Sequence, residues 1–133
     1  MIIKLRLVKQ YMNNKGQSLV VFIIILPILL MIFTLIIDLG FMYIEKRNID
    51  INCYDAVEYY LENIDKEDID KKVNNLLNEN IKNIDKILIN DEEDYVEISI
   101  TKNRKSIYSI ISNNTEIKIT YKGMKDDKRI IKG

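Results

Sequence analysis

The sequence predicts an α+β protein. A single N-terminal transmembrane helix continues into a long amphipathic helix, and a second helix and a small three-stranded antiparallel sheet follow. Three observations predict this order. Residues 19–37 are almost all apolar, apolar residues then recur every three or four positions as far as residue 89, and beyond residue 94 they alternate with polar ones. A chain of 133 residues has room for one small domain beside such a segment.

The apolar run from Leu19 to Ile37 reads LVVFIIILPILLMIFTLII, and only Pro27 and Thr34 depart from strongly apolar side chains. As a helix it is about 28 Å long, close to the hydrocarbon thickness of a bilayer. One alternative is a buried core helix, but a domain this small cannot cover a helix that is apolar all round. Another is a cleaved secretory signal, whose apolar region is usually shorter and ends in small residues. A retained membrane anchor is favoured, with Pro27 kinking or loosening it.

The charges beside the run predict its orientation. Residues 1–16 carry four cations and no acid, whereas residues 38–60 carry five acids and two cations, Lys46 and Arg47. Because cationic flanks stay in the cytoplasm, the N-terminus is expected inside and the C-terminus outside. We therefore expect a basic cytoplasmic leader over residues 1–16, a transmembrane helix over 17–44 and an extracytoplasmic α+β domain over 45–133.

Helical spacing continues beyond the membrane segment. One helix is expected from about Gln17 to about Asn63, because only Gly40 interrupts it and one glycine costs about 1 kcal/mol. Its outer half carries an apolar face made of Tyr43, Ile49, Cys53, Val57, Tyr60, Leu61 and Ile64. A second helix is expected from about Lys66 to Ile89, with an apolar stripe that packs on this face.

The three expected strands follow the acidic turn Asp91–Asp94. They cover residues 96–101, 106–112 and 116–122, where apolar and polar residues alternate. Asn113 and Asn114 are expected to form a tight hairpin between the last two, since asparagine tolerates a positive φ. The charged tail over residues 123–133 is expected to fray.

Composition excludes several kinds of active site. The chain has no histidine, which removes His-based catalysis and His metal ligands, and one cysteine, which cannot form an internal disulfide or a CxxC site. Lys and Arg total 20 and so do Asp and Glu, so no global charge indicates a nucleic-acid partner. We expect no enzymatic activity and no cofactor.

Three smaller features have ordinary structural explanations. Cys53 lies on the apolar face of the first helix, so a buried thiol is expected. Residues 91–94 lack the spacing of a calcium loop and indicate a solvated turn. Residues 113–115, Asn-Asn-Thr, match a glycosylation sequon that turn chemistry explains equally well.

The start of the apolar helix carries a more specific pattern. Residues 15–27 read KGQSLVVFIIILP, and Ile37-Asp38-Leu39-Gly40 follows downstream. Over residues 15–60 the chain resembles the TadE-like family of tight-adherence (Tad) pilus assembly proteins, which have a short basic leader, a Gly, and then roughly G-x-x-x-V-E-F-x-L-x-x-P. The family-motif positions in register are Gly16, Val20, Phe22, Leu26 and Pro27, with Asp38, Gly40 and Tyr43 further on.

The resemblance implies a membrane-anchored, pseudopilin-like component of a Tad-type pilus or secretion apparatus, with a pilin-like fold. It implies other pilus or pseudopilin subunits and secretion-apparatus proteins as partners, and a prepilin-type peptidase that cuts between Gly16 and Gln17. Where the family has a Glu that pairs with the new N-terminal amine, this chain has Val21. The alternative function is a single-pass extracytoplasmic binding or sensor subunit unrelated to pili.

Overall fold

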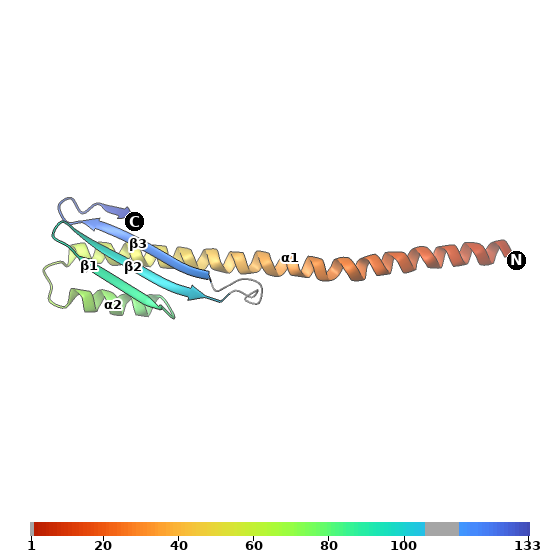
Figure 1. Ribbon diagram of the computed structural model, residues 1–133, viewed down its shortest axis with the longest axis horizontal. Helices are drawn as coiled ribbons and strands as arrows, with labels where there is room; N and C mark the ends of the chain where they lie inside the picture. The colour runs from red at the N-terminus through yellow and green to blue at the C-terminus, as the bar shows by residue number, and fades with distance from the viewer. Residues whose placement is uncertain (1, 106–114) are drawn as a thin grey trace. The chain divides into compact units, whose positions relative to one another are not determined.

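The computed structural model describes residues 2–105 and 115–133 and contains helices and strands in the order shown in Figure 1. The elements are α1 (Ile2–Glu62), α2 (Ile69–Asn80), β1 (Lys86–Asp91), β2 (Tyr95–Arg104), β3 (Thr115–Met124) and β4 (Ile130–Lys132). The chain divides into two compact units, Met1–Leu39 and Gly40–Gly133. The α+β class is confirmed, and within the described residues the sheet has four strands, where three were predicted.

Helix α1 ends at Glu62, within one residue of the predicted end, but it begins at Ile2 and not at about Gln17. Gly16 does not end the helix, because one glycine costs only about 1 kcal/mol. The helix also continues through Pro27 and Gly40. The leader and the apolar run therefore belong to one helix.

The second helix is shorter than predicted. Helix α2 ends at Asn80, where Ile81 takes an extended conformation, and Asn83 then adopts a positive φ of 58°. The prediction that the helix reaches Ile89 is wrong, since residues 86–91 form β1. Ile87 and Ile89 of this strand pack against the core, whereas Leu88 on its other face is 42% exposed.

The sheet is antiparallel throughout, in the order β1-β2-β3-β4. The strands predicted over 96–101 and 116–122 are confirmed as β2 and β3, which pair directly, with Ile98 opposite Tyr121. The strand predicted over residues 106–112 and the hairpin at Asn113-Asn114 lie outside the described residues. The prediction of a frayed tail is wrong for Ile130–Lys132, which pair with β3 as β4.

One face of the sheet packs against the last part of α1 and against α2 (Figure 1). The core joins side chains from both helices and the sheet: Ile49, Cys53, Ala56, Val57, Tyr60 and Leu61 of α1, Ile69, Val73 and Leu77 of α2, Ile81, and Val96, Ile98, Ile100, Ile117 and Ile119 of the sheet. Gly123 of β3 is buried against α1, and a Cβ there would lie 2.6 Å from Val57 Cγ1. The predicted apolar face of α1 is thus the face that covers the sheet, although Tyr43 is 65% exposed.

Candidate functional site

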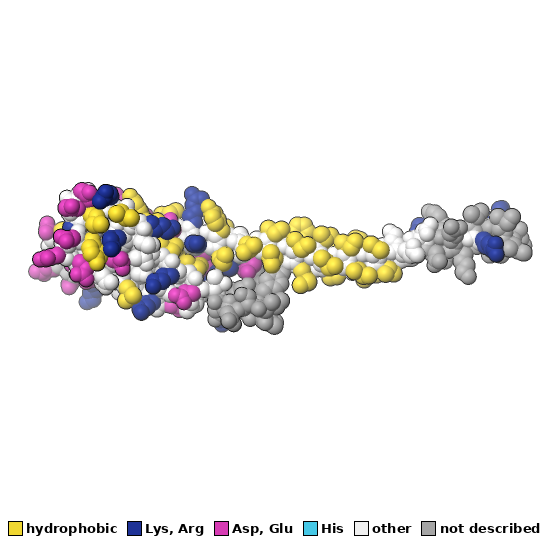
Figure 2. All heavy atoms as spheres, turned by 45° about the horizontal axis from the view of Figure 1, so that its top comes forward, with side chains coloured by type: hydrophobic (Ala, Val, Ile, Leu, Met, Phe, Trp, Pro, Cys, Tyr) yellow, Lys and Arg dark blue, Asp and Glu magenta, His cyan; other side chains and the backbone are white. Residues whose placement is uncertain are grey.

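The apolar part of α1 is the largest exposed hydrophobic surface of the described chain. Figure 2 shows its side chains gathered along the helix, and every apolar side chain from Leu19 to Ile37 is between 42% and 60% exposed. The hydroxyl of Thr34 donates a hydrogen bond to the Leu30 carbonyl, 2.7 Å away, so this polar group is satisfied within the helix. Among the described residues, α1 is the one helix long and apolar enough to cross a membrane.

Four of the eight family-motif positions lie on one face of α1. At 3.6 residues per turn, Gly16, Val20, Pro27 and Asp38 fall within about 40° of one another around the helix. Phe22 lies on the opposite face. We call the surface of Gly16, Val20, Pro27 and Asp38 the motif face. Gly16 and Gln17 are exposed within the helix, and no atom lies near the position of a Cβ on Gly16 or Gly40.

Asp38 differs from its neighbours in burial. Leu39 is 52% exposed and Ile37 is 53% exposed, but Asp38 is only 8% exposed. A carboxylate next to a strongly apolar run needs a polar environment. Asp38 is therefore the one motif position whose side chain is withdrawn from solvent within the described part of the chain.

Two cations of the sheet hold Glu45, the first acid that follows Asp38 along α1. The carboxylate of Glu45 on α1 forms ion pairs with Lys102 and Arg104 at the end of β2, with Arg104 Nε 3.1 Å from Glu45 Oε2. All three side chains are largely buried, between 13% and 25% exposed. This cluster ties the end of β2 to α1.

Five residues further along α1, Asp50 contacts strands β3 and β4 of the sheet. Its Oδ1 accepts a hydrogen bond from the Tyr121 hydroxyl and pairs with Lys132 Nζ, each at 2.9 Å. The Tyr121 ring also meets the Tyr54 ring edge-on at 5.7 Å. Asp50 therefore joins α1 to both β3 and β4.

The electrostatics of this group favour an ionised Asp50. Burial raises the pKa of Asp50, but hydrogen bonds from Lys132 and Tyr121 outweigh it, and the pKa lies below its ordinary value of 3.8. Burial and the hydrogen bond to Asp50 raise the pKa of Tyr121 to about 12. The carboxylate is charged and the phenol is protonated at neutral pH.

A basic pocket of about 350 Å³ lies beside this group, lined by Tyr43, Lys46, Arg47, Asp50 and Lys132. Lys132 is engaged by Asp50, whereas Lys46 and Arg47 are exposed and make no ion pair with any residue that the structure describes. The positive charge of the pocket is therefore only partly neutralised.

Cys53 is buried as predicted, with none of its surface exposed. Its Sγ lies 3.3 Å from the Ile98 carbonyl oxygen, and burial raises the pKa of the thiol to about 12. Because the thiolate is the reactive form, a thiol with this pKa is inert at neutral pH.

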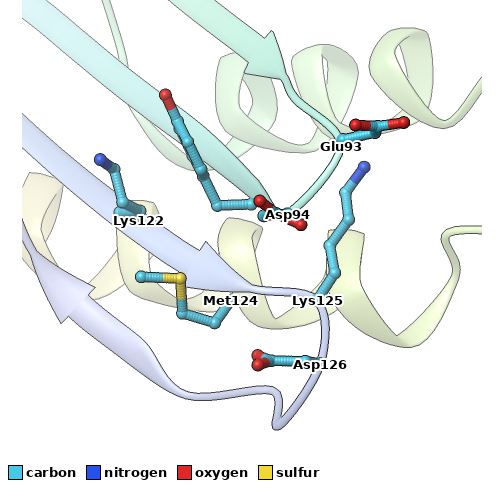
Figure 3. A pocket seen from close by; sticks show the side chains of 7 residues that line it. Glu93, Asp94, Lys122, Met124, Lys125 and Asp126 are labelled. Carbon is cyan, nitrogen blue, oxygen red and sulfur yellow. The ribbon is translucent and has the colours of Figure 1, made fainter.

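A second pocket, of about 780 Å³, opens between the β1–β2 turn and the β3–β4 turn. Figure 3 shows Lys125 reaching from one turn toward Glu93 on the other. The Lys125 amide donates to the Asp94 carbonyl at 2.9 Å, and its ammonium pairs with Asp91.

The acidic turn acts as a structural connection in this pocket. Asp91 has a lowered pKa because Lys125 hydrogen-bonds it, and Tyr60 hydrogen-bonds it as well. Among the described residues, no cluster of His, Cys, Asp and Glu side chains is arranged to hold a metal ion.

Comparison with models of protein families, with curated protein sequences and with solved structures finds no significant match for this chain.

Sequence reasoning identified the apolar segment and Cys53, but it missed the two polar clusters around Glu45 and Asp50. Their members are separated by up to 82 positions, as Asp50 and Lys132 are. One signal was available: Glu45, Lys46, Arg47 and Asp50 are the first charges after the expected membrane helix over residues 17–44.

Proposed function

We propose that the chain is a membrane-anchored, pseudopilin-like component of a Tad-type pilus or secretion apparatus, with a structural or assembly role. The observation that carries the anchor is the exposure of all seventeen apolar side chains between Leu19 and Ile37. Moving a fully exposed side chain of this kind into an apolar environment gains about 1.5–3 kcal/mol. These side chains are about half exposed, so each gains a fraction of that. A bilayer supplies that environment over the length of one helix.

Charge supports the orientation. The leader, residues 1–16, carries four cations and no acid, so it stays in the cytoplasm and residues 45–133 lie outside. The protein is then a single-pass protein of the cell membrane, and its α+β part is available to extracytoplasmic partners.

The assembly role rests on the motif residues and on the order of the elements. An N-terminal apolar helix that continues into a helix packed on an antiparallel sheet is the arrangement expected of a pilin-like subunit. Pro27 lacks the N–H that would reach the Ile23 carbonyl, and in lipid a neighbouring helix can cover such a carbonyl. We infer that the motif face contacts the helix of another pilus or pseudopilin subunit.

Processing is the sharpest test of the family assignment. Co-expression with a prepilin-type peptidase should yield a membrane protein that begins at Gln17, read by N-terminal sequencing. Gly16→Leu should block the cut, because a small residue lets the protease approach the backbone. Gly40→Leu, which also fills open space on α1, is the matched control and should be cleaved normally.

Retention of Met1 in the presence of an active peptidase would contradict this processing and favour the binding or sensor subunit.

The topology of the protein in the membrane is tested separately. Carbonate extraction should leave the protein in the membrane pellet, and protease added to spheroplasts should degrade residues 45–133. Full protection of those residues would contradict the orientation.

Contact through the motif face is tested by disulfide cross-linking in a Cys53→Ala background. Met31 lies four residues after Pro27 on the motif face, and Leu29 lies nearly opposite at similar depth. Met31→Cys should cross-link to a partner helix when co-expressed with pseudopilin subunits, and Leu29→Cys should not. Equal cross-linking of both variants would contradict a defined helix contact.

A further inference from the structure

We propose that the basic pocket of Tyr43, Lys46, Arg47 and Lys132 binds the phosphate of an anionic phospholipid headgroup in the outer leaflet. This inference rests on the membrane anchor of the proposed function and assigns a ligand to residues that the assembly role leaves unused. It also gives a role to Lys46 and Arg47, the two cations on the outer flank of the membrane segment.

The position of the pocket in the chain fits a headgroup. The expected membrane segment ends at residue 44, and Lys46 and Arg47 follow it at once. Tyr43 is 65% exposed, and tyrosine is enriched at membrane interfaces because its ring is apolar and its hydroxyl is polar. Long cationic side chains beside such a ring reach the headgroup layer.

The charge of the pocket fits an anion. Its one acid, Asp50, is already satisfied by Lys132 and the Tyr121 hydroxyl, each 2.9 Å from Oδ1. The neighbouring acid, Glu45, is held by Lys102 and Arg104. Lys46 also attracts the charge of Asp50. With three cations against one acid, the pocket keeps a net positive charge in an open space of about 350 Å³.

The side-chain types fit a phosphate. The guanidinium of Arg47 offers paired donors that match two phosphate oxygens, and the ammonium of Lys46 adds a compact positive charge. Inorganic phosphate from solution offers the same chemistry, so the experiment has to separate the two sources.

The absence of tryptophan provides a direct probe. Tyr43→Trp introduces one indole at the pocket, and lipids with brominated chains quench an indole that they contact. In vesicles of zwitterionic lipid, we expect a small fraction of brominated anionic lipid to quench this fluorescence more than the same fraction of brominated zwitterionic lipid.

Lys46→Gln/Arg47→Gln in the Tyr43→Trp protein should lower the preference for the anionic lipid about fivefold or more, because each cation near an anionic surface contributes about that factor to affinity. The matched control is Lys71→Gln/Lys72→Gln, which removes two adjacent exposed cations from α2 and should keep the preference. Equal quenching by both lipids, or equal loss in both double variants, would overturn the proposal.

Two further measurements are needed. One distinguishes a lipid headgroup from phosphate in solution, and the other distinguishes failure of the lipid site from failure of the membrane anchor. Loss of the preference on adding inorganic phosphate, but not sodium chloride of equal ionic strength, would assign the site to phosphate in solution and overturn the lipid proposal. Extraction of the protein by carbonate would overturn the anchor, and this proposal with it. Stable insertion without lipid preference would overturn this proposal alone.

Discussion

At the scale of single residues, Gly123 sets how closely α1 approaches the sheet. A Cβ at this position would lie 2.6 Å from Val57 Cγ1 and 2.8 Å from Leu61 Cδ1, closer than packed atoms allow. Valine is stiff at χ1, so it cannot swing away as a longer side chain could. The absence of a side chain at residue 123 is therefore a packing requirement.

Gly123→Ala should lower the free energy of unfolding by about 1–3 kcal/mol through overpacking. Urea unfolding followed by circular dichroism measures this change. Val57→Ala opens the space, so the double variant should lose less stability than the two single losses combined. Strict additivity would mean that Val57 does not cause the strain.

Substitution of Cys53 tests whether the buried thiol has a chemical role. Cys53→Ala should lower the free energy of unfolding by about 1–2 kcal/mol, because a buried cysteine behaves as a small apolar group. The proposed assembly with other subunits should be unchanged. A thiol reagent should modify the wild-type protein only in denaturant, since the pKa of Cys53 is raised to about 12. Rapid modification of the folded protein would contradict an inert thiol.

At the scale of elements, the contact between Asp50 of α1 and Tyr121 of the sheet makes the stability of the fold depend on pH. The folded pKa of Asp50 is below 3.8, so its contribution to stability is present above that pH and is lost as the pH falls through the folded value. The pKa of Tyr121 is raised from 10.0 to about 12, so its contribution is present below pH 10 and is lost as the pH rises toward 12.

The Asp50→Asn variant should therefore lose less stability than the wild type when the pH falls below 4. The Tyr121→Phe variant should lose less stability than the wild type when the pH rises above 10. Urea midpoints measured across pH check both. Tyr43→Phe is the control for the alkaline change, because Tyr43 is 65% exposed. An alkaline loss that is unchanged in Tyr121→Phe would contradict the assignment.

At the scale of the whole molecule, residues 40–133 form a compact unit with its own core. A soluble protein of residues 45–133 should fold with mixed helix and strand by circular dichroism. Its stability should be only a few kcal/mol, because about ninety residues bury limited surface. A spectrum without helix or strand would contradict independent folding.

The sequence predicted those parts of the fold that depend on neighbouring residues. The apolar segment is visible because its apolar residues form one continuous stretch of the sequence. The inner face of α1 from Ile49 to Leu61, the buried Cys53, and strands β2 and β3 follow from periods of 3.6 and 2 residues. Each of these signals lies within a few turns or one strand.

Tertiary structure decided what local patterns leave ambiguous. Ile81, Ile84 and Leu88 fit a helical stripe, yet Ile87 and Ile89 also alternate as a strand, and pairing of Ile89 with Ile98 of β2 selects the strand. The charged tail joins the sheet because Gly123 pairs with Ile130 across a turn. The clusters of Glu45 and Asp50 join residues more than 50 positions apart. Such contacts exist only after the chain has closed these long loops, so no local period encodes them.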